Sequence, residues 1–172
     1  ELTRKKQAKE EDEETFDQFK IRHTEYNKIK ITSGNSFTIS KSKFVAHVAT
    51  VKSEEDVQEV MYELYKNKHI AEATHNMIAY RFETPNVCTV LLFFSITFFF
   101  QKNIAEHGDD DGETGASDQL LFLLQRGQVV NTLVVVTRWY GGIKLGPDRF
   151  RIITNVAKEL LQEMGILKVK QK

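Results

Sequence analysis

The stretch LVVVTRWYGGIKLGPDRF, residues 133–150, decides the fold of this chain. Its first residues, Leu133 to Val136, are all apolar and mostly β-branched, which is typical of a buried strand. Pro147 suits the first position of a helix, and an amphipathic pattern follows it. Between strand and helix lie three glycines within six residues, which allow positive φ angles or a close approach of backbones. The stretch therefore predicts a buried strand, a glycine-rich turn and a helix.

The turn carries basic and aromatic side chains, including the only tryptophan of the chain. Arginine and aromatic rings beside exposed backbone N–H groups suit phosphate and single-stranded nucleic acid. The helix that starts after Gly146 adds an anion-binding terminus. In a competing interpretation, Trp139 and Tyr140 belong to the core and the glycines only shape a turn. The candidate residues for binding a partner or nucleic acid are Arg138, Trp139, Tyr140, Gly141, Gly142, Lys144, Gly146 and Arg149.

A second unusual stretch, DDDGETGAS, lies upstream at residues 109–117. Its carboxylates could bind a hard cation, or form an acidic turn before a helix N-terminus. A third interpretation pairs Glu113 or Asp111 with Arg138 or Arg149 across the fold. The spacing lacks the later ligands of a calcium-binding hand, so no metal site is assigned. The acidic cluster consists of Asp109, Asp110, Asp111 and Glu113.

His75 and Asn76 precede a predicted strand at residues 77–82. His75 could act as a general base or a ligand, although a lone histidine at a strand start is more often structural. It has no metal-ligand spacing to His47 or His69, and no nucleophile motif, phosphate loop or dinucleotide fingerprint is present. We expect no catalytic residues and no cofactor, with metal-assisted hydrolysis as the alternative.

The composition bounds the class of protein. The 172 residues suffice for one domain plus a tail, and 24 basic against 24 acidic side chains leave no net charge that demands nucleic acid or a membrane. A single cysteine, Cys88, cannot form an internal disulfide, which suits a reducing compartment.

Strands alternate with helices, so we expect an α+β domain, an α/β sandwich in which helices pack on one face of a mixed sheet. The predicted domain covers residues 32–172, and residues 1–31 are expected to be a charged linker or a marginal helix. Besides the elements named above, we expect strands at 37–40 and 44–51, a helix capped by Ser53, and a helix at 117–125.

Residues 87–101 fit this pattern badly, because eleven of the fifteen are apolar and five are phenylalanine. A membrane helix needs about 20 such residues, so the segment is too short to span a bilayer comfortably. One interpretation is a natural hydrophobic insertion or buried strand. The other is a retained intron, because valine codons begin with GT, and FFFQ at 98–101 is what a pyrimidine tract ending in CAG would encode. Joining Asn86 to Lys102 restores an ordinary strand and turn.

Three separated motifs resemble those of the IMPACT family and its bacterial relatives of the YigZ type. They are ATHN at 73–76, DDGETGA at 110–116, and RWYGG followed by LGPDRF at 138–150. They occur in the family's order, and the resemblance covers roughly residues 35–165 apart from the hydrophobic segment. It implies a fold like the second domain of a ribosomal small-subunit protein.

The resemblance also implies a function: a cytoplasmic repressor in the response to amino-acid starvation. Such a protein competes for a large ribosome-associated co-activator and so inhibits the stress kinase of translation initiation factor two. Ribosomes and actin are the further partners it implies, with RNA contact as an alternative and no membrane association. Eukaryotic members carry an additional N-terminal RWD domain that is not visible here, and residues 1–31 resemble the linker that would follow it.

Overall fold

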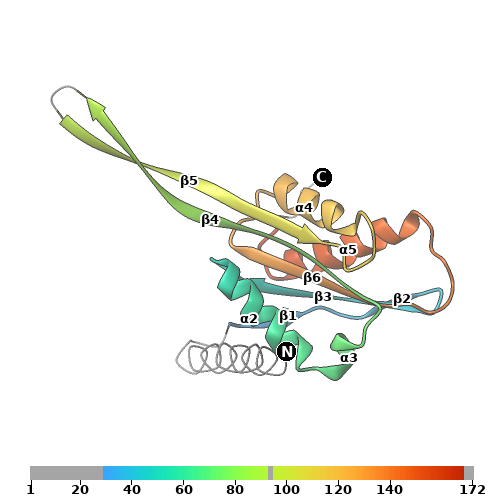
Figure 1. The fold of residues 1–172 in the computed structure, drawn as a ribbon. Coiled ribbons are helices and arrows are strands. Elements are labelled where there is room, and N and C mark those ends of the chain that lie inside the picture. The colour runs from blue at the N-terminus through green and yellow to red at the C-terminus, as the bar shows by residue number, and fades with distance from the viewer. Residues whose placement is uncertain (1–28, 93–94, 169–172) are drawn as a thin grey trace, which may run out of the picture.

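The computed structural model describes residues 29–92 and 95–168, with the backbone alone for 85–92 and 95–102. Its strands form one sheet in the order β1-β3-β6-β4-β5, with β2 paired to β3 (Figure 1). The elements are β1 (Ile31–Ser33), β2 (Phe37–Ile39), β3 (Ser42–Thr50), α2 (Glu54–Tyr65), α3 (Lys68–Ala71), β4 (His75–Leu92), β5 (Ser95–Asp109), α4 (Ala116–Arg126), β6 (Thr132–Trp139) and α5 (Asp148–Glu163). The predicted α+β class is confirmed.

The predicted strand at Leu133 to Val136 is the middle of β6, the central strand of the sheet. It pairs antiparallel with β3 on one side and with β4 on the other. Every residue from Thr132 to Arg138 is buried, and the apolar ones alternate between the two faces. Because β6 is apolar on both faces, both faces need a cover.

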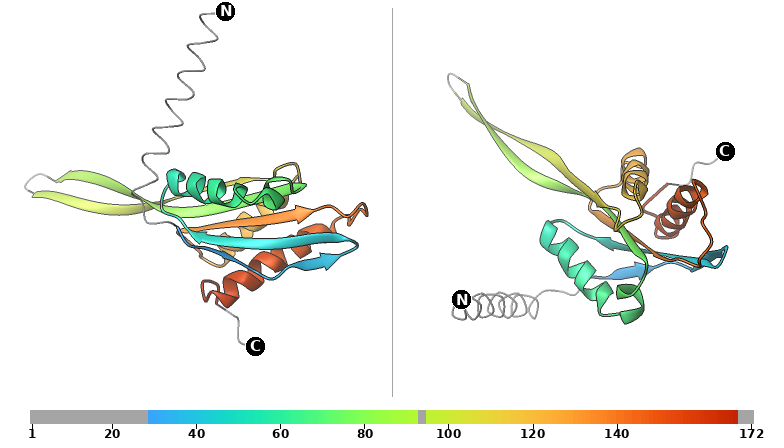
Figure 2. Two further views of the ribbon diagram at one scale, coloured as in Figure 1. Left: turned by 90° about the horizontal axis from the view of Figure 1, so that it is seen from below. Right: turned by 45° about the vertical axis from the view of Figure 1, so that its right-hand side comes forward.

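The helices supply that cover from two sides. Helices α4 and α5 pack over one face, where Val134 and Val136 lie, whereas α2 packs over the other, where Leu133 and Val135 lie (Figure 2). The structure thus refines two details of the predicted sandwich. Helices cover both faces, as the apolar pattern of β6 requires. Every described strand pairing is antiparallel, so the described sheet is not mixed.

The helix starts follow the sequence closely. The Ser53 hydroxyl accepts a hydrogen bond from the backbone N–H of Asp56 at 3.2 Å, so Ser53 caps α2 as predicted. Helix α4 extends the predicted 117–125 by one residue at each end. Helix α5 begins at Asp148 with Pro147 in the N-cap position, one residue later than predicted, which is a shift within the ordinary uncertainty of helix ends.

Strands β4 and β5 continue together beyond the rest of the sheet and form an extended hairpin (Figure 1). Strand β6 pairs with β4 only as far as Arg81, whereas β4 and β5 pair with each other as far as Leu92 and Ser95. The described residues of the hydrophobic segment, 87–92 and 95–101, lie in the outer part of this hairpin. Its origin, as a natural insertion or a retained intron, stays a prediction.

The predicted linker or helix at residues 1–31 lies outside the described residues except for its last three, of which Ile31 begins β1. In the part of the chain that the structure describes, no helix is long and apolar enough to cross a bilayer.

Candidate binding site at one end of the sheet

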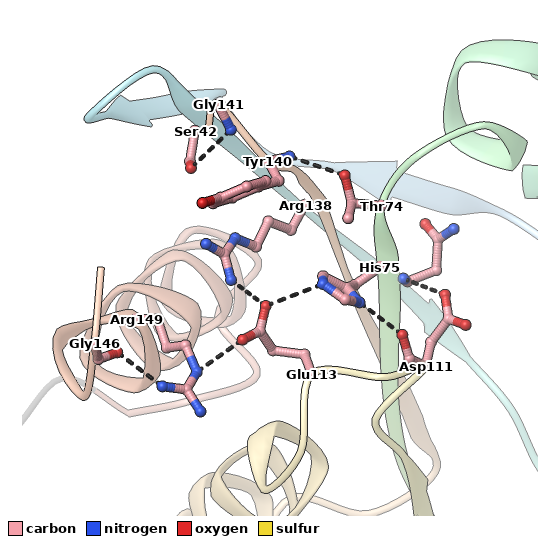
Figure 3. Close-up of polar contacts among 11 residues, drawn as sticks. Ser42, Thr74, His75, Asp111, Glu113, Arg138, Tyr140, Gly141, Gly146 and Arg149 are labelled. Atoms are coloured by element: carbon pink, nitrogen blue, oxygen red, sulfur yellow. Dashed lines mark hydrogen bonds and ion pairs between the residues drawn. The ribbon is translucent and has the colours of Figure 1, made fainter. Parts of the chain in front are cut away.

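The sheet brings the sequence motifs together at the end opposite the extended hairpin. Backbone pairing places Phe37 opposite Phe44, Phe44 opposite Arg138, and Arg138 opposite His75, which makes one row across four strands. The acidic stretch joins β5 to α4 and passes over this row (Figure 3). His75 and Arg138, far apart along the chain, therefore meet through strand register rather than through local sequence.

Glu113 is the centre of the site. Its carboxylate accepts a hydrogen bond from Nη1 of Arg138, and its Oε1 lies 2.7 Å from Nε of Arg149. His75 Nε2 lies 3.5 Å from the other carboxylate oxygen. The side chains of Glu113 and Arg138 are only 7% and 5% exposed, whereas that of Arg149 is 28% exposed. The hypothesis that Glu113 pairs with Arg138 or Arg149 is confirmed, because it pairs with both.

Two aromatic rings enclose the Arg138 guanidinium. Its central carbon lies 5.4 Å from the ring centroid of Phe44. It also lies 5.4 Å from the ring centroid of Tyr140, and Figure 3 shows these two side chains next to each other. With Arg149 nearby, two guanidinium cations share the single carboxylate of Glu113, so the group retains one positive charge when His75 is neutral. Arg138 was a candidate surface contact, but its side chain lies beneath the surface and supports Tyr140.

The three aspartates of the acidic stretch each have a different partner. Asp110 accepts hydrogen bonds from the backbone N–H groups of Gly115 at 2.8 Å and Ser117 at 2.7 Å, at the start of α4. Burial opposes ionisation of Asp110, but these backbone donors outweigh it and hold the pKa of the carboxyl below its usual value. Asp109 accepts from the backbone N–H of Asp111 at 2.9 Å. The predicted acidic turn before a helix is thus present.

Asp111 connects the acidic stretch to β4. Its carboxylate accepts a hydrogen bond from the backbone N–H of Asn76 at 2.7 Å, and its carbonyl oxygen lies 2.7 Å from Nδ1 of His75. The carboxylates therefore point to separate partners, and among the described residues no group of three His, Cys, Asp or Glu could hold a metal ion.

Asn76 is a buried link between elements. Its amide donates to the carbonyl of Ile70 at 3.0 Å and accepts from the Thr137 hydroxyl at 2.9 Å, which joins α3 to β6. The neighbouring Thr74 hydroxyl accepts from the backbone N–H of Tyr140 at 2.9 Å. The predicted ATHN motif thus fixes the end of β6 and the start of the glycine loop.

Trp139 and Tyr140 lie on opposite sides of the sheet. The Trp139 indole donates to the carbonyl of His69 at 2.9 Å, and Lys43 lies 5.2 Å from the ring centroid, so this side chain packs against α3. Tyr140 is 42% exposed. The core interpretation therefore describes Trp139 but not Tyr140.

The glycine loop packs directly on the turn between β2 and β3. A Cβ on Gly141 would lie 2.1 Å from the carbonyl carbon of Lys41, so no larger residue fits without a backbone shift. The Gly141 N–H donates to the Ser42 hydroxyl at 3.2 Å. Gly142 and Gly146 have positive φ angles of 85° and 57°, with nothing within 4 Å of an added Cβ.

Two parts of this end of the sheet were not singled out from the sequence. The first is Ile143, which was not among the candidates although its neighbour Lys144 was. Both side chains are exposed, and that of Ile143 is 47% exposed. The β2–β3 turn was also missed, although Ser40 and Lys41 form a two-residue connection between pairing strands. Arg149, another candidate, donates to the Gly146 carbonyl at 2.9 Å and so ties α5 to the loop.

The antiparallel sheet, the helices on both of its faces and the glycine loop beside a buried ion-pair network define an α+β domain with a preformed loop site at one sheet end. The model of the Impact N-terminal domain matches residues 40–161, which is most of the chain. The chain belongs to the IMPACT family.

Similar proteins include Protein IMPACT-B of Xenopus tropicalis, 44% identical over 135 residues, and Protein IMPACT of Homo sapiens, 43% identical over 133 residues. The matches cover 78% and 77% of this chain but only 38% and 37% of those proteins. Among solved structures, the two-domain translational regulator Yih1 is 31% identical, with a TM-score of 0.48 over 80% of this chain and 47% of that one. The crystal structure of a hypothetical protein has a similar fold, with a TM-score of 0.53 and 20% sequence identity. That match covers 86% of this chain and 65% of the hypothetical protein's chain.

Proposed function

We propose that this chain is the binding domain of a translation regulator that acts under amino-acid starvation. It restrains the stress kinase of translation initiation factor two by competing for the kinase's large ribosome-associated co-activator. Membership of the IMPACT family supports this role. Because the chain spans about two fifths of the length of its relatives, the proposal concerns the contribution of this domain to a longer protein's activity.

One observation carries the proposal: the fold holds an exposed apolar loop in a fixed position. Tyr140 and Ile143 are 42% and 47% exposed, yet hydrogen bonds tie the loop that bears them to Ser42 in β3, to Thr74 just before β4 and to Arg149 in α5. A loop that is ordered before binding loses little conformational freedom when a partner docks. Exposed apolar side chains on such a loop are typical of a protein-binding site.

The proposed partners are the co-activator, ribosomes and actin, met in the cytoplasm and without membrane association. RNA contact is the second candidate, because Tyr140 offers an exposed aromatic ring on the same loop as the exposed, basic Lys144. Stacking on aromatic rings beside cationic side chains is how single-stranded RNA binds without strict sequence preference.

The test uses this chain as bait in lysates of starved cells, with half of each sample treated with RNase. We expect the co-activator to be retained in both halves, and phosphorylation of initiation factor two to fall in starved cells that express the chain. Loss of all partners after RNase treatment would favour the RNA-binding candidate instead. No co-activator in either half, together with unchanged phosphorylation, would contradict the proposal.

A further inference from the structure

We infer that the exposed side chains at this end of the sheet form one docking surface for an acidic, partly apolar segment of a partner protein. The inference rests on the proposed function and names the kind of contact it uses. We call this the sheet-end surface; its residues are Phe37, Ile39, Lys41, Tyr140, Ile143 and Lys144. Half of them come from the β2–β3 hairpin and half from the glycine loop.

The two halves adjoin each other because their backbones touch. Gly141 lies so close to Lys41 that an added Cβ would be 2.1 Å from its carbonyl carbon, and the Ser42 hydroxyl accepts from the Gly141 N–H (Figure 3). Strand register adds a second link, because Phe37 pairs with Phe44, whose ring contacts the same Arg138 guanidinium that lies against Tyr140.

Exposed apolar side chains gather on this surface. Phe37, Ile39, Tyr140 and Ile143 are 45%, 37%, 42% and 47% exposed, and they are four of the eight large hydrophobic side chains that are exposed among the described residues. Single exposed apolar residues are ordinary, but several together in one place mark an interaction site.

The tip of the hairpin is strained. Ser40 and Lys41 have φ angles of 46° and 62°, in the left-handed region, where two-residue hairpin turns usually place asparagine and glycine. A non-glycine residue is disfavoured there, and such strain is concentrated at functional sites. The turn thus keeps a lysine next to the apolar residues at a cost in stability.

The charge of the surface points to an acidic partner. Lys41 and Lys144 are exposed, and none of the six residues carries a carboxylate. Beneath them, Arg138 and Arg149 share the single carboxylate of Glu113, which leaves one positive charge in excess. The aliphatic Ile39 and Ile143 favour a protein over a nucleic acid, because bases stack on aromatic rings rather than on aliphatic side chains.

The test measures direct binding of the purified chain to the purified co-activator. The first variant, Ile39→Ser with Ile143→Ser, removes the apolar contacts, and the second, Lys41→Glu with Lys144→Glu, reverses the charge. We expect each variant to bind about tenfold more weakly or worse, a loss of about 1.4 kcal/mol. The control for the first variant is Ile104→Ser with Phe122→Ser, because these side chains are 45% and 56% exposed but lie outside the sheet-end surface. The control for the second is Lys158→Glu with Lys168→Glu, at two exposed lysines outside that surface. Controls should bind within about twofold of the wild type, a difference well below that loss. Unfolding curves show that each variant is folded.

The outcomes separate the inference from the proposed function. If the wild type binds and both sheet-end variants bind within about twofold of it, the inference is overturned and the proposed function is unaffected. No binding by the wild type counts against the proposed function itself. A single-stranded uridine oligonucleotide serves as a second probe. If the variants lose only this RNA and keep the co-activator, the surface binds nucleic acid and the inferred partner is wrong.

Discussion

At one end of the sheet, Glu113, Arg138 and Arg149 form a largely buried ion-pair network; at the other, β4 and β5 simply run on together beyond β6. The first end is held by side chains from several elements that must match one another. The second is described by backbone pairing between two neighbouring strands. An end built on matched side chains tolerates few substitutions, whereas one built on a hairpin can change length without disturbing the rest of the fold.

The largest expected effect comes from removing the carboxylate at the centre of the network. Glu113→Ala leaves Arg138, which is 5% exposed, without its acidic partner, and we expect the free energy of unfolding to fall by about 3–5 kcal/mol. Urea denaturation at neutral pH measures this change.

Glu72→Ala is the control, because it breaks an ion pair with Lys68 in which both side chains are well exposed. That loss should stay below about 1 kcal/mol. If the two substitutions cost the same, the network does not hold this end of the sheet and the contrast between the ends disappears.

Two neighbouring glycines separate steric packing from backbone strain at the same end. Gly141→Ala places a methyl group against the Lys41 backbone and should cost about 2 kcal/mol. Gly142→Ala meets no atom within 4 Å but requires a φ of 85°, and should cost about 1 kcal/mol.

Amide chemical shifts distinguish the two causes. Only Gly141→Ala should move the signals of residues 39–42, because only there does the new methyl group reach the β2–β3 turn. Unchanged signals of residues 39–42 in Gly141→Ala would mean that the loop and the hairpin are not in direct contact.

Removing residues 87–101, with Asn86 joined to Lys102, tests the other end. A two-stranded ribbon gains little stability in water, and an apolar sequence of this kind promotes aggregation. We expect the soluble yield to rise and the melting temperature to increase by about 2–4 °C, which corresponds to about 1 kcal/mol. Co-activator binding should be unchanged because the sheet-end surface lies at the opposite end. No gain in yield or melting temperature would show that the hairpin contributes to the fold.

The smallest effect concerns Asp110, which caps α4. Because the pKa of its carboxyl is lower in the folded chain than in the unfolded one, its contribution is present above the unfolded pKa and is lost as the pH falls through the folded pKa. Asp110→Asn should cost about 1 kcal/mol or less near pH 7. Urea denaturation at decreasing pH should show the difference from wild type shrinking below about pH 4. A difference that does not depend on pH would mean that the charge of Asp110 does not matter.

The sequence was most informative where local chemistry decides the structure. The apolar run at Leu133 to Val136, the cap at Ser53 and the helix after Pro147 all appear where expected, because each depends on neighbouring residues. Covered faces on both sides of the sheet could also have been predicted, since β6 is apolar at successive positions.

The remaining features depend on contacts between distant residues. That Glu113 pairs with an arginine could be proposed from charge, but that it pairs with both depends on the β5–α4 connection and α5 meeting at the end of β6. Gly141 meets Ser42 across 99 residues, so no local pattern indicated that the β2–β3 turn belongs to the site. Tyr140 directly follows the last residue of β6, so strand alternation could place it opposite Trp139 only with the end of the strand already known.

The antiparallel register of β4 and β5 has a practical consequence. Pro85 pairs with Lys102 and Asn86 with Gln101, so the two ends of any segment placed between them are already neighbours. Such a position accepts a folded insert with closely spaced termini, such as a fluorescent protein, without pulling the strands apart. A reporter carried there would stand away from the sheet-end surface and could follow this domain in starved cells while leaving the surface open to its partners.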